Sequence, residues 1–179
     1  MSRTIAFLRA INVGGHTVKM DVLRRHFESL GYIDVETFIA SGNVIFTASS
    51  HNAQLLELTI ENKLQDALGY EVATFLRTEG EVAGIANYQP FRRSELEAAV
   101  AVNVAFLKDP LDGPSIKKLA SLKTGIDDFK AHDREVYWLC RRKQSESTFS
   151  NAVLERTLGI KSTVRGMNTI QKLAAKYSF

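Results

Sequence analysis

Near the start of the chain, polar residues and glycines follow a short apolar stretch; they are Arg9, Asn12, Gly14, Gly15 and Lys19. Glycine permits positive φ angles and lets a ligand approach backbone amides, and the N-terminus of a helix favours anions. Because a helix is predicted just after Lys19, these residues predict a binding site for an anionic group. A plain turn between a strand and a helix is the alternative interpretation of the double glycine.

Two further segments supply candidate members of this site. Ser41 and Asn43 flank Gly42, and Arg165 and Asn168 lie in a C-terminal segment. The side-chain amides of Asn12 and Asn43 and the hydroxyl of Ser41 are uncharged donors and acceptors of the kind that orient a small ligand. The alternative is local, because asparagine and serine also stabilise turns by bonding to nearby backbone groups.

The position of Arg9 in its strand predicts how far its side chain is buried. It follows Ile5 and Phe7 on one face of a strand predicted over 5–9, so we expect its side chain to be substantially buried. A buried guanidinium needs a carboxylate, carbonyl groups or a bound anion.

Several kinds of site are excluded or disfavoured by the residues. The loop at Gly14 lacks the glycine patterns of nucleoside-triphosphate and dinucleotide sites. The four histidines show no metal-ligand spacing, so no metal and no cofactor is expected. Asp127 and Asp128 are adjacent on a strand and point to opposite faces, so they form no acid–base pair. The single cysteine, Cys140, reads as a small buried hydrophobe.

Taken in order, the segments Leu8-Arg-Ala-Ile-Asn-Val-Gly-Gly15, Ser41-Gly-Asn43 and Arg165-Gly-Met-Asn-Thr169 resemble a bacterial family known as domain of unknown function 1697. The resemblance runs from Phe7 to about Lys176. It departs from the family pattern at Ala10, where glycine is usual, and within Arg165–Asn168, where arginine usually precedes asparagine directly. That family has no established activity, so the resemblance implies no catalytic residue.

The charge is unevenly distributed along the chain. Residues 1–99 hold 9 Lys and Arg against 12 Asp and Glu, a net −3, whereas residues 100–179 hold 14 against 8, a net +6. A basic surface of this kind suits an anionic ligand or nucleic acid, or the attraction of the acidic half. Tyr137 and Trp138 precede the cluster Arg141-Arg-Lys143 and could stack on bases, although core packing is the favoured interpretation.

The single cysteine suits a reducing compartment, and no apolar stretch is long enough to cross a membrane, so we expect a cytoplasmic protein. With 45% hydrophobic residues the chain can bury a core without disulfides.

Hydrophobic periodicity predicts a repeated order of strands and helices. In the first half, strands are expected at 5–9, 35–40, 43–48 and 71–77, and helices at 21–30 and 52–68, with a hairpin turning at Ser41-Gly42. After a short helix near 79–87, strands are expected at 101–108, 127–131, 135–140 and 162–165, and helices at 114–123 and 151–158. A last helix is expected to begin at Asn168, with that side chain as its cap and Gln171 completing a capping box.

This order predicts an α+β fold with two tandem split β-α-β, or ferredoxin-like, subdomains. The expected domains are 1–80 and 100–179, the second with a C-terminal helix, joined by a helical linker at 81–99. The leading hypothesis for function is a binding protein for an anionic ligand, either a phosphorylated small molecule or nucleic acid. An enzyme for a small phosphorylated or carboxylated substrate and a homodimeric scaffold are the alternatives.

Overall fold

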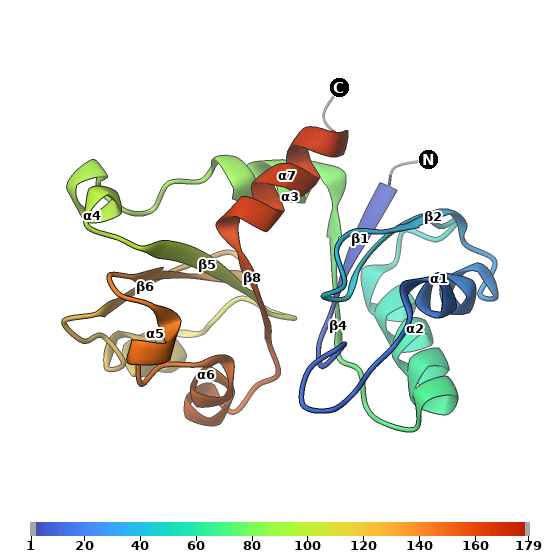
Figure 1. Cartoon of the computed structure of the whole chain (residues 1–179), viewed down its shortest axis with the longest axis horizontal. Coiled ribbons are helices and arrows are strands. Elements are labelled where there is room, and N and C mark those ends of the chain that lie inside the picture. Colours follow the sequence, from blue (N-terminus) through green and yellow to red (C-terminus); the bar gives the residue numbers. More distant parts are fainter. Residues whose placement is uncertain (1–2, 178–179) are drawn as a thin grey trace. The chain divides into compact units, whose positions relative to one another are not determined.

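Strands and helices are interspersed along the described part of the chain, residues 3–177 of this computed structural model (Figure 1). The chain divides into two compact units, each with its own sheet. The first unit comprises the residues up to Gly84 together with those from Leu173 onward, and the second comprises Ile85–Lys172.

The first unit is built on a four-stranded antiparallel sheet with the strand order β2-β3-β1-β4. Its strands are β1 (Arg3–Leu8), β2 (Ile33–Thr37), β3 (Asn43–Thr47) and β4 (Thr74–Thr78). The helices α1 (Met20–Glu28) and α2 (Ala53–Leu68) cover one face of this sheet. Leu23 and Phe27 of α1 and Ile60 of α2 are fully buried there, which is the usual driving force for docking an amphipathic helix on a sheet.

The second unit repeats this arrangement with the strand order β6-β7-β5-β8. Its strands are β5 (Ala101–Phe106), β6 (Asp127–His132), β7 (Glu135–Cys140) and β8 (Thr163–Gly166). The helices α5 (Gly113–Ala120) and α6 (Asn151–Leu158) share a core with this sheet, in which Trp138 and Leu154 are buried. The short elements are α4 (Arg93–Glu97) and η1 (Gln144–Glu146).

Two helices contain the points at which the chain passes between the units. They are α3 (Glu79–Asn87) and α7 (Met167–Tyr177). The last turn of α7 is fastened to β2 within the first unit, where Lys176 Nζ and Tyr177 Oη both donate to Glu36 Oε2, at 2.7 and 2.9 Å.

The predicted α+β fold with two subdomains is confirmed. The helices at 79–87 and 151–158 lie where the periodicity placed them, and α4 lies within the stretch 81–99 that was predicted as a helical linker. Among residues 3–177 no helix has the length and apolar character to cross a membrane.

The predicted hairpin at 35–48 forms, but its loop is longer than the two residues expected. Strand β2 ends at Thr37, and five residues, Phe38–Gly42, connect it to β3. The backbone N–H of Phe38 donates to the carbonyl of Asn43 at 3.0 Å. Gly42 has the predicted positive φ, at 79°.

Candidate functional site

The double glycine of the first motif forms a turn. The N–H of His16 donates to the carbonyl of Val13 at 3.0 Å, and the two central residues have φ of 59° and 85°. A four-residue turn with two positive φ angles is the geometry that favours glycine at both positions. A Cβ on Gly14 or Gly15 would meet no atom within 4 Å, so the backbone angle, and not crowding, calls for glycine here.

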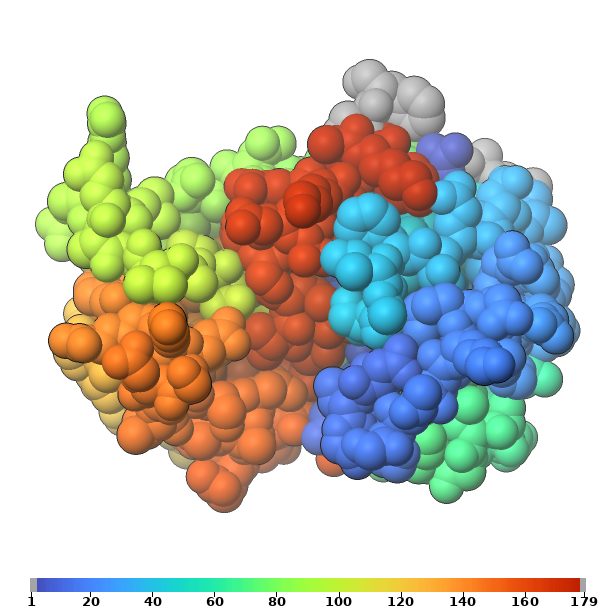
Figure 2. Space-filling view, in the orientation of Figure 1, coloured from blue at the N-terminus to red at the C-terminus, as the bar shows by residue number. Residues whose placement is uncertain are grey.

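Asn12 joins this loop to the β2–β3 loop. Its Nδ2 donates to the carbonyl of Ala40 at 2.8 Å, and its Oδ1 accepts from the N–H of Val18 at 2.7 Å. Figure 2 shows the two loops side by side on the surface of the first unit. The amide that we expected to orient a ligand therefore holds two loops together.

Ser41 and Asn43 act in the same cluster of loops. Asn43 is fully buried, and its Nδ2 donates to the carbonyl of Phe38 at 2.9 Å and to Ser41 Oγ at 3.0 Å. Gly42 accepts a hydrogen bond from the N–H of Leu8 at 2.9 Å. The first two motifs are thus brought together, and the named amides serve local structure.

The two cations of the first motif lie in different surroundings. Arg9 is half-buried and directly follows the last residue of β1, Leu8. Its backbone N–H donates to the carbonyl of Ala73 at 2.9 Å. Lys19 is exposed and directly precedes α1.

Arg165 and Asn168 belong to the second unit, where they have different roles. Arg165, in β8, is only 8% exposed, and its Nη1 donates to Thr163 Oγ1 at 2.7 Å and to the carbonyl of Val164 at 3.0 Å. Burial lowers the pKa of its guanidinium from its ordinary range to about 10. Asn168 is exposed in the first turn of α7. The prediction that Asn168 caps this helix is wrong, because β8 runs directly into a helix that begins at Met167.

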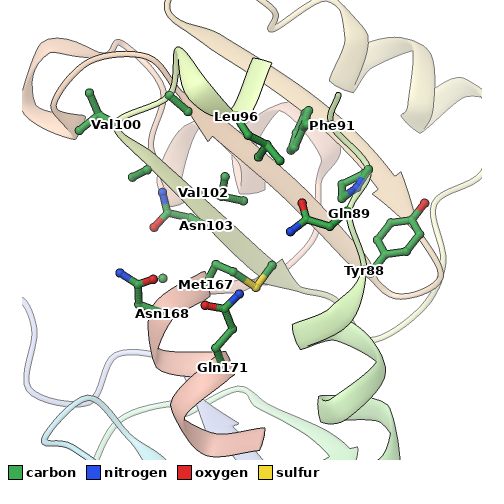
Figure 3. A pocket seen from close by; sticks show the side chains of 14 residues that line it. Tyr88, Gln89, Phe91, Leu96, Val100, Val102, Asn103, Met167, Asn168 and Gln171 are labelled. Carbon is green, nitrogen blue, oxygen red and sulfur yellow. The ribbon is translucent and has the colours of Figure 1, made fainter. Parts of the chain in front are cut away.

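The C-terminal motif lines a pocket of about 330 Å³ within the second unit, here called the α7 pocket (Figure 3). Four segments contribute to its wall: the start of α7 with Gly166, the start of β5 with the residues before it, the connection after α3, and α4. The lining residues are 88–91, Leu96, 99–103, 166–168 and Gln171. Figure 3 shows amide side chains from three of these segments around the same space.

Asn103 is the member of this pocket that sequence reasoning missed. It is 4% exposed in the middle of β5, and its Oδ1 accepts from Gln144 Nε2 at 3.1 Å. Its Nδ2 is buried and has no hydrogen-bond partner among the described residues. A single asparagine in the otherwise apolar strand Ala-Val-Asn-Val-Ala-Phe was the signal that could have found it.

The charge around the α7 pocket comes from the end of a helix and not from the side chains of its wall. The residues that line it carry no acidic and no basic side chain. The first turn of α7, an eleven-residue helix, opens onto it. The first N–H groups of a helix have no partners within the helix, and the helix dipole places partial positive charge at this end.

The other candidates in the chain have structural explanations. Tyr137 and Trp138 are both buried, and Trp138 Nε1 donates to Asp127 Oδ1 at 2.7 Å, so they form no exposed stacking platform. Asp128 instead meets Lys123 at 3.3 Å, which agrees with the expectation that Asp127 and Asp128 point apart. Cys140 is buried, and burial raises the pKa of its thiol. No group of metal-ligating side chains occurs among residues 3–177.

The basic cluster at 141–143 is partly paired with acids of its own unit. Arg141 lies 3.8 Å from Asp128, and Arg142 lies 3.9 Å from Glu146. Such pairing leaves less free positive charge for phosphates than the sequence alone suggests.

Comparison with known proteins identifies the family. The family described as "Protein of unknown function (DUF1697)" matches residues 1–137, so this chain belongs to it. The C-terminal motif at 165–169 lies outside the matched residues. No curated protein matches the chain. A solved structure of the conserved bacterial protein SP0830 from Streptococcus pneumoniae is similar to it, with a TM-score of 0.80 at 22% identity, over 100% of this chain and 99% of that one. This likeness concerns the fold.

Proposed function

We propose that this member of the DUF1697 family is a binding protein for a small anionic ligand, held in the α7 pocket. The observation that carries the proposal is the unpartnered Nδ2 of Asn103. A buried donor left without an acceptor costs about 1–3 kcal/mol, and such groups in native proteins call for an explanation. A bound anion would provide the missing acceptor, directly or after a small rotation of the amide.

The surroundings of Asn103 support the same ligand charge. The N-terminal turn of α7 contributes backbone donors, and Asn168 and Gln171 add amides that can donate as well. Within the described part of the chain, no carboxylate lines the pocket to repel an anion. The site that we propose is therefore centred on the segment around Asn168. The sequence had suggested a centre at Arg9, Asn12, Gly14, Gly15 and Lys19.

The cluster of loops in the first unit supports the proposal less well. The amides of Asn12 and Asn43 already bond to backbone groups, and the double glycine is explained by its turn. The buried, unpaired Cys140 supports a cytoplasmic location as part of the same proposal.

A thermal-shift experiment with a charge variant tests the proposal. Asn168→Asp places a negative charge at the second residue of α7, where it favours the helix but repels an anion. Gln54→Glu is the matched control, because Gln54 is the exposed second residue of α2 in the first unit. The probes are acetate, orthophosphate and adenosine monophosphate, each against sodium chloride at equal ionic strength.

We expect at least one probe at about 100 times its Kd to raise the melting temperature of the wild type and of Gln54→Glu by about 5–10 °C. The same probe should raise that of Asn168→Asp much less. An equal rise in all three proteins, or no rise with any probe, would contradict the proposal.

A further inference from the structure

We infer that the ligand of the α7 pocket carries a peptide-type amide one carbon away from a carboxylate, as an N-acyl amino acid or the last residue of a peptide does. This inference rests on the proposed function and deepens it. It depends on a feature that an inorganic anion would not use, the uncovered edge of β5.

The edge of β5 is uncovered where the strand enters the pocket. The ladder between β5 and β8 begins at the pair Asn103 and Gly166. Ala101 and Val102 come earlier in β5 and pair only with β7, through Cys140 and Leu139. Ala101 and Val102 therefore have no partner in β8, because β8 ends at Gly166 and α7 begins at Met167.

An uncovered strand edge presents backbone donors and acceptors to whatever lies beside it. Successive residues of a strand direct their N–H and C=O groups to alternate sides. One of the two residues, Ala101 or Val102, therefore directs both groups toward the uncovered side. Since both residues line the α7 pocket, a ligand there meets an N–H and a C=O in strand geometry.

A peptide amide is the group that matches such a pair, because it brings one donor and one acceptor of its own. Addition of an extended segment to a sheet edge is a common mode of peptide recognition. The short uncovered stretch accommodates about one amide. A carboxylate next to that amide would then lie toward the first turn of α7 and the Nδ2 of Asn103.

The rest of the wall suits an aliphatic side chain. Phe91, Leu96 and Met167 line the pocket, and Figure 3 shows their side chains together with the amides. The volume of about 330 Å³ is at the small end for ligand sites, so it suits a ligand of one or two residues.

A pair of ligands that differ in one atom tests the inference by isothermal titration calorimetry on the full chain. The first is N-acetyl-L-leucine. The second is the acetate ester of the corresponding 2-hydroxy acid, which keeps the carboxylate, the carbonyl and the side chain but replaces the amide N–H by oxygen. We expect the amide to bind about three- to tenfold more tightly than the ester, as the loss of one hydrogen bond implies.

The outcomes separate this inference from the proposed function. Equal binding of the amide and the ester, weakened in both cases by Asn168→Asp, would overturn the inference and leave the anion site standing. Binding of neither compound, while orthophosphate binds, would overturn it as well. Failure of every anion would overturn the proposed function itself.

A third ligand, the peptide Ala-Ala-Leu, distinguishes the two sources of this chemistry. Binding as tight as that of N-acetyl-L-leucine would support peptide ends as ligands. Binding of N-acetyl-L-leucine alone would support a free N-acyl amino acid.

Discussion

The side chain of Asn103 lowers the stability of the folded chain, because it buries a donor without a hydrogen-bond partner. Its side chain is 4% exposed, and among residues 3–177 only its oxygen has a hydrogen-bond partner. An asparagine kept for stability would have both ends of its amide satisfied. The unsatisfied amide in the middle of an apolar strand therefore supports the proposed anion site.

Replacement of this asparagine by leucine should therefore separate stability from binding. Asn103→Leu removes the unpartnered donor and keeps the branched side chain of four heavy atoms, and Gln144, which is exposed, can bond to water instead. We expect the free energy of unfolding in urea to stay equal or to rise by about 1 kcal/mol, with weaker anion binding. A loss of 2 kcal/mol or more would show that the amide is needed for folding.

Gly42 is the residue on which the contact between the first two motifs depends. Its φ is 79°, and a Cβ there would lie 2.9 Å from Ile11 Cβ and 3.2 Å from Leu8 Cβ. We expect Gly42→Ala to lower the free energy of unfolding by about 2–4 kcal/mol, from the positive φ and from overpacking together.

Gly31→Ala is the matched control for this change. Gly31 has a φ of 83°, but a Cβ there would meet no atom within 4 Å. It should therefore show the cost of the backbone angle alone, about 1–2 kcal/mol. Equal losses for the two variants would mean that the contact with Ile11 and Leu8 is not tight.

At the scale of single residues, the sequence predicted types of interaction better than partners. Gly42 has the positive φ that its turn required, and Asp127 and Asp128 point apart as strand alternation demands. The use of Asn12 and Asn43 depends instead on which loop lies opposite, and residues 28 positions apart, such as Asn12 and Ala40, give no local signal of contact.

Among the elements, α7 shows both the strength and the limit of periodicity. Its buried stripe of Ile170, Leu173 and Tyr177 was readable as a helix. The first residue of the helix could not be predicted in this way. Asn168 matches the pattern of a capping residue, but the helix already begins at Met167. Boundaries depend on tertiary contacts, here the pairing of Gly166 with Asn103.

The C-terminal turn of α7 should show a characteristic pH dependence. Hydrogen bonds from Lys176 and then Tyr177 lower the pKa of Glu36 below its ordinary 4.5. The carboxylate therefore contributes stability that is fully present above pH 4.5 and is lost as the pH falls through the lowered pKa. Both partners are about half exposed, so the contribution at neutral pH is expected to be below about 1 kcal/mol.

Chemical denaturation of the wild type and of Glu36→Gln at several pH values tests this prediction. The wild type should be the more stable protein at pH 7, and the difference should shrink below pH 4.5. A difference that is the same at pH 7 and pH 3 would rule out the charged contact as its cause.

For the whole molecule, the charge imbalance between the halves was visible in the sequence, but its meaning was not. The chain has a net charge of +3, yet Arg141 and Arg142 face acids of their own unit and the aromatic residues nearby are buried. These pairings depend on strand register, which composition does not contain.

Oligonucleotides should consequently show no measurable association with the protein even at low salt. Neutralisation of Arg141, Arg142 and Lys143 together should instead lower the free energy of unfolding by about 1 kcal/mol, because Asp128 is largely buried and loses a partner. Fluorescence anisotropy with labelled single and double strands measures the association. Tight binding whose logarithmic salt slope falls by about 0.7–0.9 for each neutralised residue would restore the nucleic-acid hypothesis.

The most direct test of an anion site in the α7 pocket is an NMR titration of the nitrogen-15-labelled chain with acetate and with orthophosphate. We predict that the largest shifts occur at the backbone amides of 166–171 and at the side-chain amide of Asn103, and that they saturate together. Shifts centred on Gly14 and Gly15, or shifts scattered over the basic surface without saturation, would contradict it.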